Sequence, residues 1–206
     1  AYGADAVRAY ILFMAPPDKE LLWNEDGLAG MYKFLNRLWR VVNDLVGKAD
    51  EETLFQAGAD SAKVAEAAKV LKRERHRIVE KVANDFDRDN FNTAIAAIME
   101  LVNAAGDYLR VASADDRDAQ FSREIADVLV KLIAPIAPHF AEELWSDVLE
   151  GTGSISEQAW PTFDPEQAKA DEVELAVQVN GKVKMHIKVA ADASKDEIQD
   201  EAMKIM

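Results

Sequence analysis

Apolar residues recur at the three- and four-residue spacing of amphipathic helices through most of the chain. Asp5 is placed to cap a short helix that reaches about Met14, where a Pro-Pro pair ends it because proline has no amide hydrogen to donate. Asn24 is the expected cap of a longer helix, separated from the first by a linker at 15–23. This long helix carries a continuous apolar stripe on one face, which predicts that it packs against other helices.

Further segments show the same helical spacing. We expect helices at about 60–86, at about 91–109 and at 121–134. Pro135 stops the last of these, and Pro138 can occupy the first turn of another helix. Two helices should therefore meet at a bend.

Near the C-terminus the spacing changes to strict alternation of apolar and polar residues. Two alternating runs flank Asn180-Gly181, a pair that is typical of two-residue hairpin turns, and the second run places Lys182 and Lys184 among its polar positions. Ser194 and Glu197 form a capping box for a helix that is still running at the last residue. The pattern predicts a β-hairpin with one basic face, followed by a helix.

The fold class predicted by these patterns is mainly α, a helical bundle followed by a truncated small α+β domain with a β-hairpin and a helix. We expect a connecting helix and linker at 1–23, the bundle at 24–166 and the small domain at 170–206. A lone hairpin and one helix bury little apolar surface, so the small domain should be incomplete. Because the sequence starts at Ala1 and stops inside a patterned segment, we expect both ends to be cut from a longer chain.

The amino-acid composition argues against several classes of protein. Hydrophobic residues make up 49% of the chain, enough for a core, and no apolar run approaches the roughly 20 residues that cross a bilayer. We therefore expect a soluble protein with no membrane partner. The absence of cysteine excludes disulfides and thiolate metal sites and fits the cytoplasm. A net charge of -14 argues against a protein that coats DNA or RNA indiscriminately.

The positive charge is nevertheless grouped. Lys33, Arg37, Arg40 and Asp44 share one face of the long helix, turned away from its apolar stripe. The segment 63–81 carries seven basic and three acidic side chains. Such groups can attract a phosphate backbone locally, but they also occur on ordinary solvated helix faces, so a helical protein-interaction module remains an alternative. The neighbouring aromatic residues of the long helix are expected to belong to the core.

No residue pattern indicates catalysis. His139 is followed at helical spacing by Glu142 and Glu143, but a carboxylate metal site in a bundle needs further ligands from other helices, and none is patterned to supply them. There is no phosphate-binding glycine loop and no spacing typical of a Ser-His-Asp arrangement. We assign no catalytic and no metal-binding residue.

Several segments resemble one enzyme family. The stretch YGADAVRAYILFMAPPDKELLWNEDGLAGMYKFLNRLWRVV is similar to the segment that follows the KMSKS signature in bacterial leucyl-tRNA synthetases. FNTAIAAIMELVN at 91–103 and LIAPIAPHFAEELW at 132–145 resemble the anticodon-binding-type bundle of the leucyl, isoleucyl, valyl and methionyl class I synthetases. LAVQVNGKVKMHIKVAADASKDEI at 175–198 is similar to the start of the small C-terminal domain of the leucyl enzymes, which favours that family over its relatives.

The resemblance implies a parent enzyme that uses ATP and Mg to attach leucine to its tRNA. The HIGH and KMSKS elements of that chemistry do not occur here, so the fragment should be non-catalytic and should dock leucine tRNA beside the rest of the synthetase chain. The family's tRNA-facing basic positions fall on Lys33 and Arg37, with Arg40 one turn on, and Lys182 and Lys184 are second-tier candidates. An isoleucyl, valyl or methionyl parent remains an alternative.

Overall fold

The computed structural model describes residues 2–16, 19–20, 23–48, 60–169, 172–179, 182–190, 198–199 and 203. The chain divides into a first unit, Ala1–Gln167, and a second unit, Ala168–Met206.

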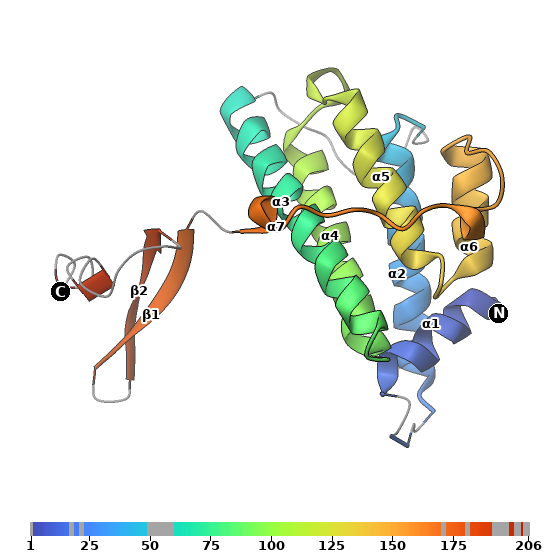
Figure 1. Cartoon of the computed structure of the whole chain (residues 1–206), viewed down its shortest axis with the longest axis horizontal. Helices are drawn as coiled ribbons and strands as arrows, with labels where there is room; N and C mark the ends of the chain where they lie inside the picture. The colour runs from blue at the N-terminus through green and yellow to red at the C-terminus, as the bar shows by residue number, and fades with distance from the viewer. Residues whose placement is uncertain are drawn as a thin grey trace. The chain divides into compact units, whose positions relative to one another are not determined.

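The first unit is helical (Figure 1). Its longer helices are α1 (Ala4–Met14), α2 (Glu25–Leu45), α3 (Ser61–Phe86), α4 (Phe91–Val111) and α5 (Ala119–Ile133). Helix α6 (Pro138–Glu143) continues into a π-helical turn, η2 (Leu144–Val148), and the short elements η1 (Ala114–Asp116), η3 (Ile155–Glu157) and α7 (Pro165–Ala168) complete it. The expected bend is confirmed, because α5 ends at Ile133 and Pro138 begins α6.

Side-chain caps fix the starts of the long helices. The Asn24 side chain accepts hydrogen bonds from the backbone amides of Asp26 and Gly27, and Asp60 caps α3 in the same way. Both predicted starts are confirmed. Helix α5 begins two residues before the predicted Phe121, because Asp118 accepts from the Phe121 amide and places the start at Ala119.

The predicted role of Asp5 was wrong. Gly3 is the N-cap of α1, and Asp5 lies inside the first turn. Its carboxylate instead reaches α6, where it accepts from the backbone amide of Phe140 at 2.6 Å and contacts Nδ1 of His139 at 3.0 Å. Ala137, the N-cap of α6, has no side-chain oxygen, so a residue from another helix satisfies an amide at its N-terminus.

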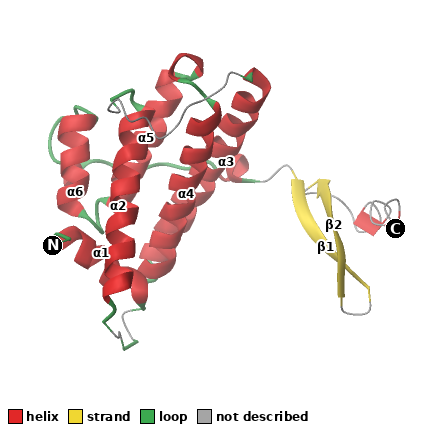
Figure 2. Ribbon diagram, turned by 180° about the vertical axis from the view of Figure 1, so that it is seen from behind, coloured by secondary structure: helices red, strands yellow, loops and turns green. Residues whose placement is uncertain are grey.

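The core forms around α4, which packs against α1, α2, α3 and α5. Its buried residues recur at helical spacing and include Ala94, Ile95, Ile98, Leu101, Val102, Ala105 and Leu109. Helix α1 packs against both α2 and α6, and these three helices lie together on one side of the first unit in the two opposite views (Figure 2). This side carries the candidate site.

In the second unit, β1 (Glu172–Val179) and β2 (Lys182–Ala190) pair antiparallel, from Glu172↔Ala190 to Val179↔Lys182. The register shifts between Val177↔Met185 and Gln178↔Val183, so strict alternation is interrupted opposite Lys184. The predicted turn at Asn180-Gly181 and most of the predicted C-terminal helix lie outside the described residues.

Candidate functional site

Helix α2 presents three exposed cationic side chains, Lys33, Arg37 and Arg40, which we call the α2 stripe. The opposite side of the helix is buried in the core through residues such as Leu35 and Leu38. Within the described part of the chain, no carboxylate pairs with a member of the stripe. The three charges therefore remain available to an anionic partner.

Asp44 does not lie on this exposed face, contrary to the prediction. It is only 5% exposed, because the segment around Arg117 covers the C-terminal end of α2. Arg117 donates from Nη1 to the Asp44 carbonyl at 2.7 Å and contacts its carboxylate at 3.3 Å. Burial raises the pKa of Asp44, and the neighbouring guanidinium opposes this rise. The α2 stripe thus has no exposed acidic member in this position.

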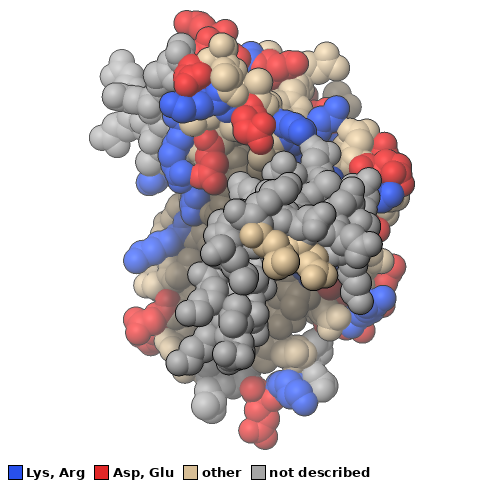
Figure 3. All heavy atoms as spheres, turned by 90° about the vertical axis from the view of Figure 1, so that its left-hand side faces the viewer, with Lys and Arg blue, Asp and Glu red and all other residues tan. Residues whose placement is uncertain are grey.

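The second basic group, on α3, is largely neutralised. Carboxylates lie within 4.0 Å of Lys63, Arg73, Arg75, Arg77 and Lys81. The partners come from α3 and its N-cap Asp60 and, through Glu100 and Glu124, from α4 and α5. The side view in Figure 3 accordingly shows Lys and Arg interspersed with Asp and Glu. This arrangement favours the α2 stripe over α3 as an anion-binding surface.

The aromatic residues of α2 divide into two kinds. Phe34 is buried, and the ring of Trp39 packs edge-on against Phe140 with centroids 5.8 Å apart, as expected of core residues. Tyr32, which no spacing pattern singles out, is exposed and lies against the equally exposed Tyr2 with ring centroids 5.3 Å apart. The sequence signal for this pair was an aromatic residue directly before Lys33, but its partner, Tyr2, lies on a distant segment.

His139 takes part in a contact between helices. Its Nδ1 faces Asp5, while the Glu142 carboxylate accepts from the Ser154 hydroxyl and the Ile155 amide. The two residues therefore have separate partners and share no ligand. Across the described residues, no group of three or more His, Cys, Asp or Glu side chains could hold a metal ion.

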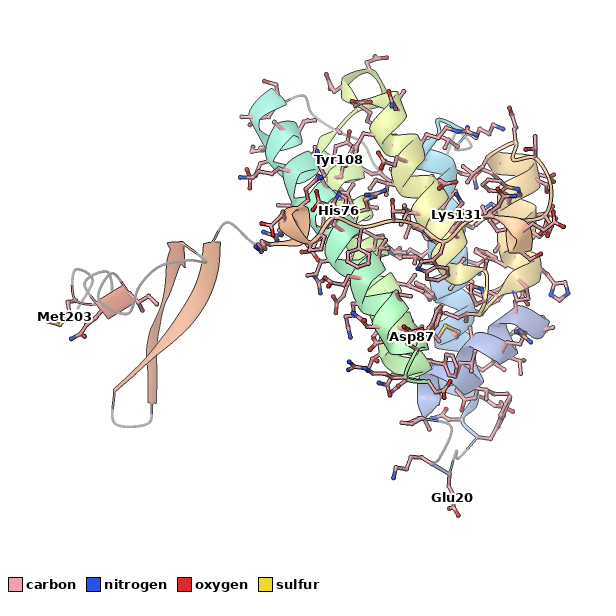
Figure 4. All side chains as sticks on the ribbon, viewed as in Figure 1. Glu20, His76, Asp87, Tyr108, Lys131 and Met203 are labelled. Atoms are coloured by element: carbon pink, nitrogen blue, oxygen red, sulfur yellow. The ribbon has the colours of Figure 1, made fainter. Side chains whose placement is uncertain are left out.

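His76, on α3, holds the chain that leads to α7 (Figure 4). Its Nδ1 accepts a hydrogen bond from the backbone amide of Asp164 at 3.0 Å. Burial is the main cause that lowers the pKa of His76, and the neighbouring Arg75 lowers it further. The neutral ring is the form that this contact requires, because a protonated imidazole has no acceptor nitrogen.

Lys182 and Lys184 lie in β2, but their side chains are outside the described part of the structure. Their role stays a prediction. Among the described helices, none combines the length and the apolar character that a membrane crossing requires.

Comparison with known proteins gives the context of this surface. The family described as anticodon-binding domain of tRNA ligase matches residues 68–199. The leucine–tRNA ligase of Fervidobacterium nodosum is 41% identical over 206 residues, which cover 98% of this chain and 24% of the relative. That of Synechococcus sp. strain JA-3-3Ab is 42% identical over 206 residues, covering 95% of this chain and 23% of the relative. The chain thus spans about a quarter of the length of these curated relatives.

A solved structure is similar over the same extent. It is the ternary complex of the LeuRS agnB2 of Agrobacterium radiobacter K84 with tRNA and LeuAMS. The TM-score is 0.71 at 28% sequence identity, and the similarity covers 98% of this chain and 25% of that one. The α2 stripe precedes the segment matched by the family but lies within the range covered by these relatives.

Proposed function

The chain belongs to the anticodon-binding-domain family of tRNA ligases, and we propose on that basis that it is the tRNA-docking part of a leucine–tRNA ligase. Its similarity to leucine–tRNA ligases extends over nearly the whole chain, and the similar solved structure is of a complex that contains tRNA. The relatives reported above favour a leucine ligase over an isoleucyl, valyl or methionyl parent.

The attachment of leucine takes place elsewhere in the proposed parent. ATP with Mg²⁺ needs oxygen ligands and a phosphate-binding surface, and the described residues include no cluster of three or more candidate ligands. The HIGH and KMSKS elements that the resemblance assigns to that chemistry do not occur in this sequence. We assign ATP and Mg²⁺ to the rest of the ligase, and we assign the whole protein to the cytoplasm.

The observation that carries this function is the contrast between α2 and α3. A phosphate contact needs a cation that is not already paired, and the α2 stripe meets this requirement whereas most basic residues of α3 do not. From Lys33 to Arg40 the helix rises by about 10 Å at roughly 1.5 Å per residue. The stripe can therefore contact successive phosphates of one strand, which positions the tRNA without reading its sequence.

The second unit supplies further contacts with the tRNA in our proposal. Residues 170–206 form the start of a small α+β domain, a hairpin followed by a helix, whose Lys182 and Lys184 make additional phosphate contacts. Residues 1–23 connect the bundle, 24–166, to the catalytic part of the ligase. The paired strands β1 and β2 support this division.

The test compares Arg37→Ala with Arg77→Ala in the intact ligase. Arg37 has no ion-pair partner among the described residues, whereas Arg77 is held by Glu74 and Glu100, so only the first change should remove a phosphate contact. We expect Arg37→Ala to weaken binding of leucine tRNA and to reduce the slope of log K against log salt by about one, with Arg77→Ala close to wild type. Leucine-dependent pyrophosphate exchange should persist in both variants. Unchanged affinity and slope for Arg37→Ala would refute the site assignment.

A further inference from the structure

A pocket of about 370 Å³ lies beside the α2 stripe, where α1, α2 and α6 meet. Its volume is within the range of about 300–1,000 Å³ that is typical of sites for small organic groups. The residues that matter for its chemistry are Tyr2 before α1, Tyr32 and Asn36 on α2, and Asp5 and His139 at the junction of α1 and α6.

Two tyrosines form one side of this pocket. Their ring centroids are 5.3 Å apart at an interplanar angle of 56°, and the residues are 42% and 41% exposed for Tyr2 and Tyr32. By contrast, Tyr10 and Tyr108 of the same unit are fully buried in the core. An exposed aromatic pair at the edge of a pocket offers a ring face on which a nucleobase can stack.

Polar groups elsewhere in the lining of the pocket are open to a ligand. The Asn36 amide has no hydrogen-bond partner among the described residues and can both donate and accept. Nδ1 of His139 faces the Asp5 carboxylate at 3.0 Å, so Nε2 of this exposed ring is the nitrogen available to a ligand. The exposed imidazole can therefore contact the polar groups on the edge of a base.

The surrounding charge favours RNA over a protein segment. Among the described residues that line the pocket, Asp5 is the one that is acidic, and both of its carboxylate oxygens are occupied, by His139 and by the Phe140 amide. On α2, Tyr32 directly precedes Lys33, and Asn36 lies one helical turn from Arg40. A strand whose phosphates lie on the stripe therefore has its sugars and bases beside the pocket.

We propose that this pocket receives one unpaired base of the bound tRNA, which stacks on Tyr32 and Tyr2 and meets Asn36 and His139 with its edge. The inference rests on the proposed function, because it requires the same RNA to lie along the α2 stripe. It goes beyond that function by adding contact to a base to the contacts with the backbone.

The experiment measures the affinity of the intact ligase for a leucine tRNA transcript after Tyr32→Ala and Tyr32→Phe. Loss of a stacking ring should weaken binding by about 5- to 150-fold, while the salt slope stays unchanged because no charge is removed. Tyr32→Phe keeps the ring face and should bind within about twofold of wild type. Phe163→Ala, which truncates a similarly exposed aromatic residue on another segment, is the matched control and should have no effect.

A second measurement identifies the base. Transcripts with an abasic site at single unpaired positions are bound by wild type and by Tyr32→Ala. At the proposed position, the loss of affinity caused by the abasic site and the loss caused by Tyr32→Ala should not add, because each change removes the same stacking contact. Additive losses at every unpaired position would overturn the proposal.

The outcomes separate this inference from the proposed function. If Arg37→Ala lowers the salt slope while Tyr32→Ala binds normally, the base pocket is wrong and tRNA docking stands. If Tyr32→Ala destabilises the intact ligase with unchanged tRNA affinity, another part of the ligase covers the pocket and the proposal fails. If neither Arg37→Ala nor Tyr32→Ala affects tRNA binding, both are refuted.

Discussion

Replacement of Arg117 by Met should severely destabilise the first unit. Arg117 donates from Nε to the Ala112 carbonyl at 2.9 Å and from Nη1 to the carbonyl and carboxylate of Asp44. The two side chains of this ion pair are only 8% and 7% exposed. Methionine fills much of the same space but leaves a buried carboxylate without its cation.

The magnitude follows from that unpaired charge. Removing one partner of a buried pair typically costs about 3–5 kcal/mol, since the remaining ion is neither solvated nor paired. Asp44 Oδ2 is already buried without a hydrogen-bond partner in the described structure, so no second contact compensates. For a chain of this size the loss corresponds to a decrease in Tm of about 6–20 °C.

The assay is denaturant unfolding followed by far-ultraviolet circular dichroism. The matched control is Arg110→Met, whose pair with Asp107 is exposed, so its loss should be about 0–1 kcal/mol. Loss of the guanidinium raises the pKa of Asp44 further, so the full loss should appear above the pKa of Asp44 in the variant. It should shrink as pH falls through that pKa, because the buried carboxyl then becomes neutral. If Arg117→Met and Arg110→Met lower the free energy of unfolding equally, the ion pair between Arg117 and Asp44 does not stabilise the end of α2.

Other predictions concern helix ends and a histidine. Asp5→Ala should cost about 1 kcal/mol and accelerate hydrogen exchange of the Phe140 amide, and an unchanged exchange rate would show that α6 does not need this cap. Because the pKa of His76 is lowered from 6.5, the unfolded chain takes up the proton first, so the free energy of unfolding should fall as pH decreases below about 6.5. His76→Phe should remove this pH dependence. A pH profile of the variant parallel to that of the wild type would contradict the role of the contact between His76 and Asp164. Gly30→Ala should raise the free energy of unfolding by about 0.5–1 kcal/mol, since a Cβ there meets no atom within 4 Å inside a helix, and a lower denaturation midpoint would refute this.

Local pattern was sufficient for the helices and for the exposed position of the α2 stripe. Asn24 could be predicted as a cap, and the start of α3 at about Asp60 could be predicted, because each side chain acts on the residues that follow it directly. Likewise, the spacing of Lys33, Arg37 and Arg40 sets their direction relative to the core whatever the rest of the chain does.

The features that could not be predicted depend on contacts between distant segments of the chain. Asp5 has the sequence position of a cap, but its carboxylate satisfies an amide 135 residues away. Asp44 follows the spacing of the stripe, yet it is buried by Arg117, which is 73 residues away. The pairing of Tyr2 with Tyr32 likewise depends on how α1 packs against α2. The spacing of residues describes one helix at a time, so it does not predict which residues of different helices are in contact.

The salt dependence of leucine tRNA binding tests the central claim most directly. The intact ligase is compared with a variant in which Lys33, Arg37 and Arg40 are all changed to Ala, and with a control that changes the paired Arg73 and Arg77. We predict that the slope of log K against log salt falls by about three for the stripe variant and by less than about one for the control. Equal slopes in wild type and the stripe variant would contradict the claim that the α2 stripe binds tRNA phosphates.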